Sequence, residues 1–337
     1  MKNSDDQFIT LAHGNGGRLT RDMIKEVFYD QLKNPFLDID RDAITVPVLE
    51  NEIVTTTDTF TVQPLEFPGG NIGSLSVHGT VNDLAVCGAK PLYLTLNAII
   101  EEGLSFDQLR RVVHSLAEAA RQASVSVVAG DTKVVSRDEC GGIYLATTGI
   151  GIKTSPQDLC MSNIKPGDSV LVSGPVGDHG TAVMLAREEF GLRGDLKSDS
   201  RSVFPLTEAI QHLSGLRFMR DPTRGGLATI AHEINASTGL GITLREQKIP
   251  VNDQVRSVCN ILGYDPYYLA SEGQVVAILD PGQATVALDQ WQSLPDGRQA
   301  AIIGTITSPH TRVVLETELG GERLLPELLD DPLPRIC

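Results

Sequence analysis

The sequence has few cysteines, and their spacing excludes two common uses of this residue. The chain has 337 residues and five cysteines, at positions 87, 140, 160, 259 and 337, with no Cys-x-x-Cys pair. An odd number of scattered cysteines fits neither a disulfide framework nor a zinc site and is typical of a reducing compartment. We expect the first four to be small core residues, which leaves Cys337 to be explained.

Long apolar runs and an excess of positive charge are also missing. No stretch approaches the roughly 20 apolar residues of a membrane-spanning helix, and no apolar run follows the polar residues 1–6 as it would in a signal peptide. Lys and Arg number 28 against 43 Asp and Glu, a net charge of −15, which argues against nucleic acid or a membrane as partner. We therefore expect a cytoplasmic protein. Its charge still permits a nucleotide held through Mg²⁺ and backbone amides.

The commonest phosphate-binding motifs are absent as well. The sequence contains no GxxxxGK(S/T), and no GxGxxG follows a predicted strand, so a Walker ATPase and a Rossmann dehydrogenase are both unsupported. The glycine-rich run 174–180 follows a predicted strand but lacks the P-loop lysine. Any nucleotide must be held by a different arrangement.

Length and hydrophobic pattern predict two α/β domains. A chain of 337 residues exceeds what one core usually supports, and strand and helix periodicities alternate in both halves. The first half is predicted as β-α-β-α-β-β, with elements at 53–57, 73–86, 92–100, 105–123, 125–129 and 143–150. In the second half we expect helices at 181–189, 206–213, 226–236 and 253–262, and strands at 168–173, 242–245, 275–279 and 301–307. The predicted divisions are an N-terminal segment 1–40 with a short helix near 19–29, domains 41–152 and 153–325, and an extended tail 326–337.

Four aspartates carry the strongest chemical signal: Asp58, Asp83, Asp131 and Asp221. Asp58 and Asp131 follow predicted strands, and ligands of α/β sheets bind at the carboxyl ends of strands. Carboxylates suit Mg²⁺, which bridges protein to phosphate. A single aspartate in such a position is more often a turn residue or helix cap than a metal ligand. The four together predict a Mg–nucleotide site. Asp221 also opens a predicted helix, whose amides could approach phosphate.

The chain ends in a cysteine on a stiff arm. Pro332 and Pro334 hold the last residues extended, and the twelve residues 326–337 could span at most about 40 Å. A thiol in such a tail is mostly protonated at neutral pH, because an unperturbed thiol has a pKa of about 8.5. The tail alone leaves open an incidental cysteine on a frayed end.

Six motifs, taken in order, make the chain resemble the HypE family, the carbamoyl dehydratases of nickel–iron hydrogenase maturation. The aspartate motifs alone indicate only the wider superfamily of aminoimidazole-ribotide (AIR) synthetase-like ATPases. The terminal Pro-Arg-Ile-Cys narrows the resemblance to the HypE family. The motifs are residues 12–18, 81–85, 129–135, 177–180, 221–226 and 334–337.

The resemblance implies a fold and a reaction. It implies two AIR-synthetase-like (PurM-like) α/β domains, with Mg-ATP between them and the first sheet forming a barrel across a homodimer. Cys337 would receive a carbamoyl group from the carbamoyltransferase HypF. The enzyme would dehydrate it to a thiocyanate with release of ADP and phosphate, and the cyano group would pass to iron on a HypC–HypD scaffold.

The resemblance also implies the site residues. Cys337 would carry the substrate, and Lys133 and Glu272 are the candidate bases, although Lys133 could equally contact phosphate and Glu272 could be a solvated loop carboxylate. His13 and His179 are expected to be structural. Gln274 and Ser271 depart from the family pattern, which has Lys and Asn there. The four aspartates would bind metal, and the nucleotide would contact Gly14, Gly16, Gly17, Thr57, Asp58, Asn82, Asp83, Asp131, Thr132, Asp221, Thr223 and Gly225.

Two alternatives stay open. One is another reaction of the superfamily, such as that of thiamine-phosphate kinase, selenophosphate synthetase or AIR synthetase, none of which needs a proline-stiffened tail ending in cysteine. The other is a nucleotide-gated carrier whose tail docks a partner without chemistry. ATP hydrolysis that depends on carbamoylation of Cys337 would separate the enzyme from the carrier.

Overall fold

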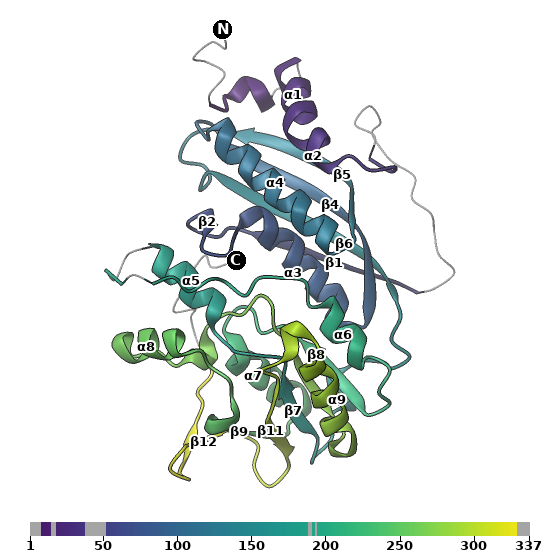
Figure 1. The fold of residues 1–337 in the computed structure, drawn as a ribbon, viewed down its shortest axis with the longest axis vertical. Helices are drawn as coiled ribbons and strands as arrows, with labels where there is room; N and C mark the ends of the chain where they lie inside the picture. Colours follow the sequence, from purple (N-terminus) through teal and green to yellow (C-terminus); the bar gives the residue numbers. More distant parts are fainter. Residues whose placement is uncertain (1–7, 15–17, 38–51, 188–190, 193, 329–337) are drawn as a thin grey trace.

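Two β-sheets lie one above the other along the long axis of the molecule (Figure 1). The computed structural model describes residues 8–14, 18–37, 52–187, 191–192 and 194–328. Ahead of the first sheet lie the short helical turn Leu11–Gly14 and the helical stretch α1 (Arg18–Met23), η3 (Ile24–Tyr29) and α2 (Asp30–Leu32). The short helix expected near 19–29 is thus confirmed and extends to Leu32.

The first sheet has four strands in the order β1-β6-β4-β5. β4 and β5 are parallel, and the other two pairs are antiparallel. The chain order follows the predicted β-α-β-α-β-β pattern. One short hairpin is added before the first helix; its two strands, β2 and β3, have two residues each. The bounds are β1 (Ile53–Phe60), β2 (Glu66–Phe67), β3 (Gly70–Asn71), α3 (Ile72–Val86), β4 (Ala89–Glu101), α4 (Phe106–Gln122), β5 (Ser126–Val135) and β6 (Ile143–Lys153).

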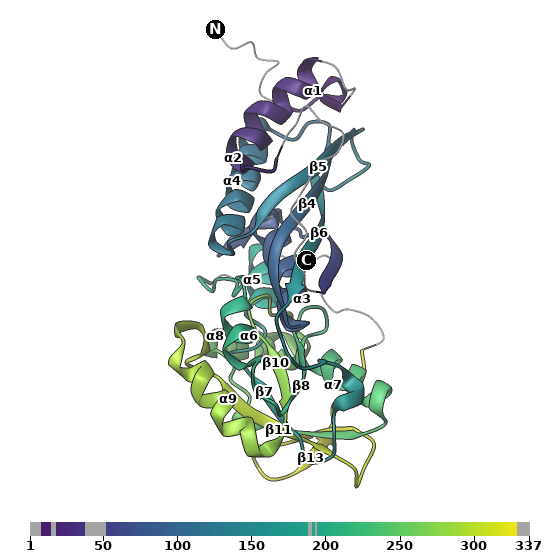
Figure 2. The ribbon, with the colours of Figure 1, turned by 90° about the vertical axis from the view of Figure 1, so that its right-hand side faces the viewer.

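Helices α3 and α4 cover one face of this sheet, and no described helix covers the other (Figures 1 and 2). Asn71 starts α3 with a capping box, since its side chain accepts from the Ser74 amide while the Ser74 hydroxyl accepts from the Asn71 amide. Ser105 caps α4 through the Gln108 amide. Almost every residue of α3 is buried, because this helix lies between the first sheet, α4 and the second half of the chain.

The second sheet has seven strands in the order β13-β12-β9-β11-β7-β10-β8. Its strands are β7 (Ser169–Val172), β8 (Leu216–Arg220), β9 (Gly241–Arg245), β10 (Val276–Leu279), β11 (Ala301–Thr307), β12 (Val313–Glu316) and β13 (Glu322–Leu324). Its helices are α5 (Asp178–Arg187), α6 (Phe204–Ile210), α7 (Gly226–Thr238), α8 (Asp253–Leu262) and α9 (Pro281–Ser293). Single turns lie at η4 (Met161–Asn163), η5 (Glu246–Lys248), η6 (Pro266–Tyr268) and η7 (Pro295–Gly297).

Both faces of the second sheet are buried around β7, an interior strand between β11 and β10. Val170 and Val172 pack in one core with α7, whereas Leu171 between them packs in another core with α6 and α9. This alternation follows from the two-residue period of a strand, and it explains why β7 reads as a continuous apolar run.

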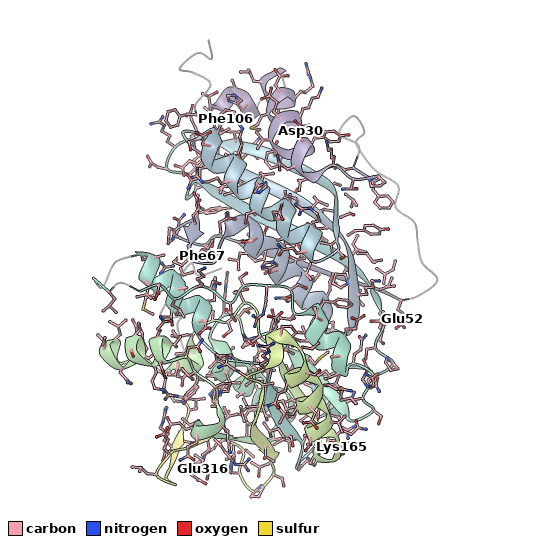
Figure 3. All side chains as sticks on the ribbon, in the orientation of Figure 1. Asp30, Glu52, Phe67, Phe106, Lys165 and Glu316 are labelled. Atoms are coloured by element: carbon pink, nitrogen blue, oxygen red, sulfur yellow. The ribbon has the colours of Figure 1, made fainter. Side chains whose placement is uncertain are left out.

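The two halves share a hydrophobic core. The cluster that fills the space between the first sheet and its helices also includes Met184 of α5 and Val255 of α8. Phe67 lies at this boundary (Figure 3). Its ring meets the His179 ring edge-on, with 5.3 Å between centroids. The side chains therefore join the sheets into one packed body.

Several expectations need correction. Asp58 and Asp131 lie within β1 and β5 rather than after them, because the pairing of each strand continues past the aspartate. Of the four cysteines expected in the core, only Cys259 is buried, whereas Cys87 and Cys160 are exposed. The prediction also omitted β2, β3, β8, β12, β13 and α9. Within the described ranges, no helix combines the length and the apolar character needed to cross a membrane.

Candidate active site

Four carboxylates from both halves of the chain lie where their charges influence one another. Asp58 is in β1, Asp83 in the last turn of α3, Asp221 directly after β8, and Glu272 in the loop before β10. Burial raises the pKa of Asp58, and the negative charge of Asp83 raises it further. We call these four residues the carboxylate cluster.

Glu272 is the most perturbed member of the cluster. Its side chain is buried, with 1% exposure of the residue. Burial raises the pKa of Glu272 well above its usual range, and the charges of Asp221, Asp199, Asp58 and Asp83 add to the effect. Its Oε1 atom is buried without a hydrogen-bond partner among the described residues. A buried carboxyl group with a raised pKa and an unpaired oxygen atom is a candidate for proton transfer.

Asp221 stands at the start of the turn that leads into α7. It is 5% exposed, and burial, followed by the negative charge of Asp83, raises its pKa to about 7. The Thr223 amide donates to the Asp221 carbonyl at 3.0 Å, and Gly225 and Gly226 adopt φ values of +68° and +60°, which favour glycine. The predicted helix after this motif is confirmed, since α7 begins at Gly226.

Asp58 and Asp83 are half-buried. The Asp58 carboxylate accepts from the following amide of Thr59 at 2.7 Å, and the Asp83 carboxylate accepts from the Thr56 hydroxyl at 2.9 Å. Burial raises the pKa of Asp83, although the Thr56 hydrogen bond and the charge of Arg220 oppose the shift. Neighbouring carboxylates with raised pKa values indicate a place where a cation would be stabilised.

Asn82 has a structural task that the sequence did not suggest. It is fully buried, and its amide nitrogen donates to the carbonyl oxygens of Arg201 and Glu272, both at 3.0 Å. Its oxygen accepts from the Val203 amide at 2.8 Å. Both N–H groups of the side chain are used, so the nucleotide contact expected of Asn82 stays a prediction that only its oxygen could fulfil in this arrangement.

Asp131 and Lys133 lie apart from the cluster. Cross-strand partners share a sheet face, and these two residues oppose Asn97 and Ile99, which are exposed on the face without helices. Three inter-strand steps separate β5 from β1, or about 14 Å. One chain therefore does not bring Asp131 or Lys133 to Asp58.

Two further predicted nucleotide residues belong to the first sheet. The Thr132 hydroxyl, next to Asp131 in β5, is buried without a hydrogen-bond partner among the described residues. Thr57 is exposed, and its hydroxyl donates to the Thr147 carbonyl at 3.1 Å. Thr57 precedes Asp58 in β1, so its side chain points to the opposite face of the sheet.

The remaining predicted residues are structural or lie outside the described ranges. The His13 ring meets Phe106 edge-on, and His179 is buried with its Nδ1 atom 2.8 Å from the Ser198 hydroxyl. Gly14 ends the first helical turn. Gly16, Gly17 and Cys337 lie outside the described residues.

Two aspartates that the sequence analysis did not select are tied to this region. The Asp199 carboxylate accepts from the amides of Glu272 and Gly273, each at 3.1 Å. Asp178 is buried and accepts twice from Asn252. Burial, together with the charge of Asp199, raises the pKa of Asp178 to about 7. Asp199 lies in a polar loop without periodicity, so no sequence signal marked it.

Comparison with protein families matches both halves of the chain. Residues 40–153 match the N-terminal domain of AIR synthase related proteins, and residues 165–316 match the C-terminal domain. The carbamoyl dehydratase HypE of Azotobacter vinelandii is 42% identical over 331 residues, which cover 98% of this chain and 97% of the relative.

Solved structures agree in fold over nearly the same length. A crystal structure of the hydrogenase maturation protein HypE in complex with ATP has a TM-score of 0.92 and 42% identity, with 97% of this chain and 99% of that chain covered. A HypE–HypF complex contains a chain with a TM-score of 0.79 and 43% identity, with 92% of this chain and 99% of that chain covered.

Proposed function

Because the chain belongs to the HypE family of carbamoyl dehydratases, built from the two AIR synthase related domains, we propose that it dehydrates a carbamoyl group carried on its own Cys337. The product is a thiocyanate on the same sulfur, the source of a cyanide ligand for the iron of a nickel–iron hydrogenase. ATP is the second substrate, since a HypE relative with the same fold has been solved with ATP.

The reaction needs ATP because oxide and hydroxide are poor leaving groups. The carbamoyl oxygen attacks the γ-phosphorus of ATP, the bond to the bridging oxygen breaks, and ADP leaves. One N–H proton then passes to a base, the carbon–oxygen bond breaks, and phosphate departs with the second N–H proton. The sum is thiocarbamate plus ATP to thiocyanate, ADP, phosphate and one proton on the base.

The observation that carries this proposal is the state of Glu272. A base for a weakly acidic N–H needs a raised pKa and a free oxygen atom. Burial and neighbouring charges raise the pKa of Glu272, and its Oε1 atom has no partner among the described residues. We therefore assign the proton transfer to Glu272 and leave Lys133 the role of a phosphate contact.

The carboxylate cluster fits a magnesium ion. Asp58, Asp83 and Asp221 would hold it, and the ion would neutralise negative charge on the phosphate oxygens. Within the described ranges, no three His, Cys, Asp or Glu side chains already form a group that could hold a metal. Mg²⁺ usually takes one or two protein carboxylates and completes its coordination with water and phosphate, so we expect only one or two of these three aspartates to bind the ion directly.

The open face of the first sheet supports a homodimer. It exposes residues of β1, β4 and β5, with no described helix over them. In the proposed dimer this face closes a barrel with its twin. Asp131 and Lys133 would then serve a nucleotide together with residues of the second chain, because the carboxylate cluster of their own chain is on the other face.

Two partners complete the proposal. HypF would supply the carbamoyl group, as the HypE–HypF complex of a relative suggests. A HypC–HypD scaffold would receive the cyano group.

Intact-mass spectrometry of the C-terminal peptide tests the proposed reaction. The protein is incubated with a HypF carbamoyl donor system, with and without Mg-ATP. A carbamoyl adduct on Cys337 should lose one water only when ATP is present. Cys337→Ala should give no adduct yet bind ATP normally, whereas Cys160→Ala, which removes another exposed thiol, should behave as wild type. An adduct that persists with ATP would indicate a carrier, and no adduct at all would favour a kinase-like reaction.

A further inference from the structure

A segment without helix or strand lies between the two halves of the chain. Residues 198–203, which we call the strap, follow the loop after α5 and lead into α6. The Ser198 amide donates to the Pro68 carbonyl at 2.8 Å. The Ser200 hydroxyl lies 3.0 Å from Nδ1 of His78 in α3. The strap is therefore fastened to the first half at two points besides the Asn82 bonds.

The other side of the strap holds the backbone of Glu272 and Gly273. The two oxygens of Asp199 accept from the Glu272 and Gly273 amides, one each, at 3.1 Å. The Arg201 guanidinium donates from Nε to the Gly273 carbonyl at 3.2 Å. Asn82 donates to the Glu272 carbonyl at 3.0 Å. Backbone groups of both residues are thus bound to the strap or to α3.

The approach is close enough to exclude a side chain at position 273. A methyl group on Gly273 would overlap the carbonyl oxygen of Asp199, with only 1.9 Å between them. Glu272 and Gly273 are buried, so an amide that lost its acceptor would stay unpaired, which destabilises the folded chain. Hydrogen bonds to a carboxylate are also about twice as strong as neutral ones.

The backbone of Glu272 is held by hydrogen bonds and its side-chain Oε1 atom is not, which indicates a function for the strap. Its backbone amide and carbonyl are both bound, whereas its buried Oε1 atom has no partner among the described residues. No described side chain fixes this oxygen, so the position of the carboxyl group depends on the backbone that bears it.

We propose that Asp199 is a positioning residue, which holds the backbone at Glu272 so that the unpaired carboxyl group stays aligned with the substrate nitrogen. This inference rests on the proposed function, in which Glu272 is the base. Asn82 assists from α3 by holding the Glu272 carbonyl.

Single-turnover kinetics on carbamoylated full-length protein tests the proposal. Asp199→Ala removes both acceptors, and the rate constant at saturating ATP should fall about 10- to 100-fold, the effect of a displacement of roughly 1 Å at a catalytic group. The ATP concentration for half-maximal rate should stay within about twofold of wild type, because Asp199 is not in the proposed nucleotide site. Asp199→Asn keeps one acceptor and should show a smaller loss.

Asp195→Ala is the matched control. Asp195 lies in the same loop and is exposed, and its carboxylate accepts from Gln254 at 3.0 Å rather than from the Glu272 loop. Its rate constant should equal that of wild type. If Asp199→Ala does not fold, the test uses Asp199→Asn alone: a reduced rate constant supports the positioning role, and the wild-type rate constant refutes it.

Failure of this inference is distinct from failure of the proposed function. A wild-type protein that yields no dehydrated product would refute the proposed function. A Glu272→Gln variant with the wild-type rate constant would refute the assignment of Glu272 as the base. If Glu272→Gln is inactive but both Asp199 variants keep the wild-type rate constant, only the positioning role is refuted. A rise in the half-maximal ATP concentration equal to the fall in rate would also refute it, since that indicates a general loss of structure.

Discussion

Replacing Asp221 by Asn should stabilise the protein in the absence of metal and nucleotide, and increasingly so as the pH rises. Asp221 is buried beside Asp83 and Asp58, and burial together with their charges raises its pKa to about 7. The ionised form therefore carries a cost in the folded chain that it does not carry in the unfolded chain. Asn has a similar shape and no charge, so the variant avoids this cost.

The size of the effect follows from proton linkage. The ordinary pKa of the carboxyl group is 3.8, so the folded chain binds this proton more tightly and the free energy of unfolding falls as the pH rises from about 4 to about 7. The difference between about 7 and 3.8 corresponds to about 4 kcal/mol, fully lost above the higher value. Of this, about 2 kcal/mol lies between pH 5.5 and 8, a range that avoids the isoelectric region near 4.9.

Urea denaturation with EDTA present, followed by tryptophan fluorescence, measures this difference. Trp291, the only tryptophan, is fully buried in the same half as Asp221. The free energy of unfolding of Asp221→Asn, relative to wild type, should increase by about 2 kcal/mol between pH 5.5 and 8. Asp289→Asn, an exposed change on α9, should give no such trend. A difference for Asp221→Asn that is constant with pH would refute the reasoning.

Three shorter predictions concern the metal, the backbone and the tail. Asp83→Asn should weaken Mg-ATP binding about tenfold or more by isothermal titration, and unchanged affinity would remove Asp83 from the site. Gly226→Ala should lower the free energy of unfolding by about 1–3 kcal/mol, because its φ is +60° and the new methyl group would meet the carbonyl oxygens of Tyr267 and Leu269 at 2.6 and 2.7 Å; a stability equal to wild type would contradict this. Deletion of residues 332–337 should leave the proposed dimer unchanged by light scattering, and a monomer would show that the tail takes part in assembly.

The sequence predicted the longer elements and missed short ones. The helix at 73–86 and the strand at 143–150 match α3 and β6 closely: Gly88, whose φ is +76°, marks the end of the helix, and buried positions alternate along the strand. β12 and β13 have only four and three residues, too few to show a period. α9 carries Ala284, Ala287 and Trp291 on its buried face, but small alanines give a weak hydrophobic signal.

The site was less accessible to sequence reasoning than the fold. Motifs brought attention to Asp58, Asp83 and Asp221, which the structure places in one cluster with Glu272. They could not show that Asp131 lies on the opposite sheet face, because this depends on how far β5 continues along β4. Asp199 was invisible because its contact with Glu272 spans 73 residues and involves backbone amides, which no sequence pattern displays.

The bonds of Asn82 also bear on how the protein is synthesised and folds. Its amide joins residues 119 and 190 positions further along the chain, so both contacts can form only after most of the second half has been made. A nascent chain that ends before Glu272 would hold Asp58 in β1 and Asp83 in α3 without the fourth carboxyl group of the cluster. Under the proposed function, the site would be complete only when Cys337, the last residue of the sequence, has also been added.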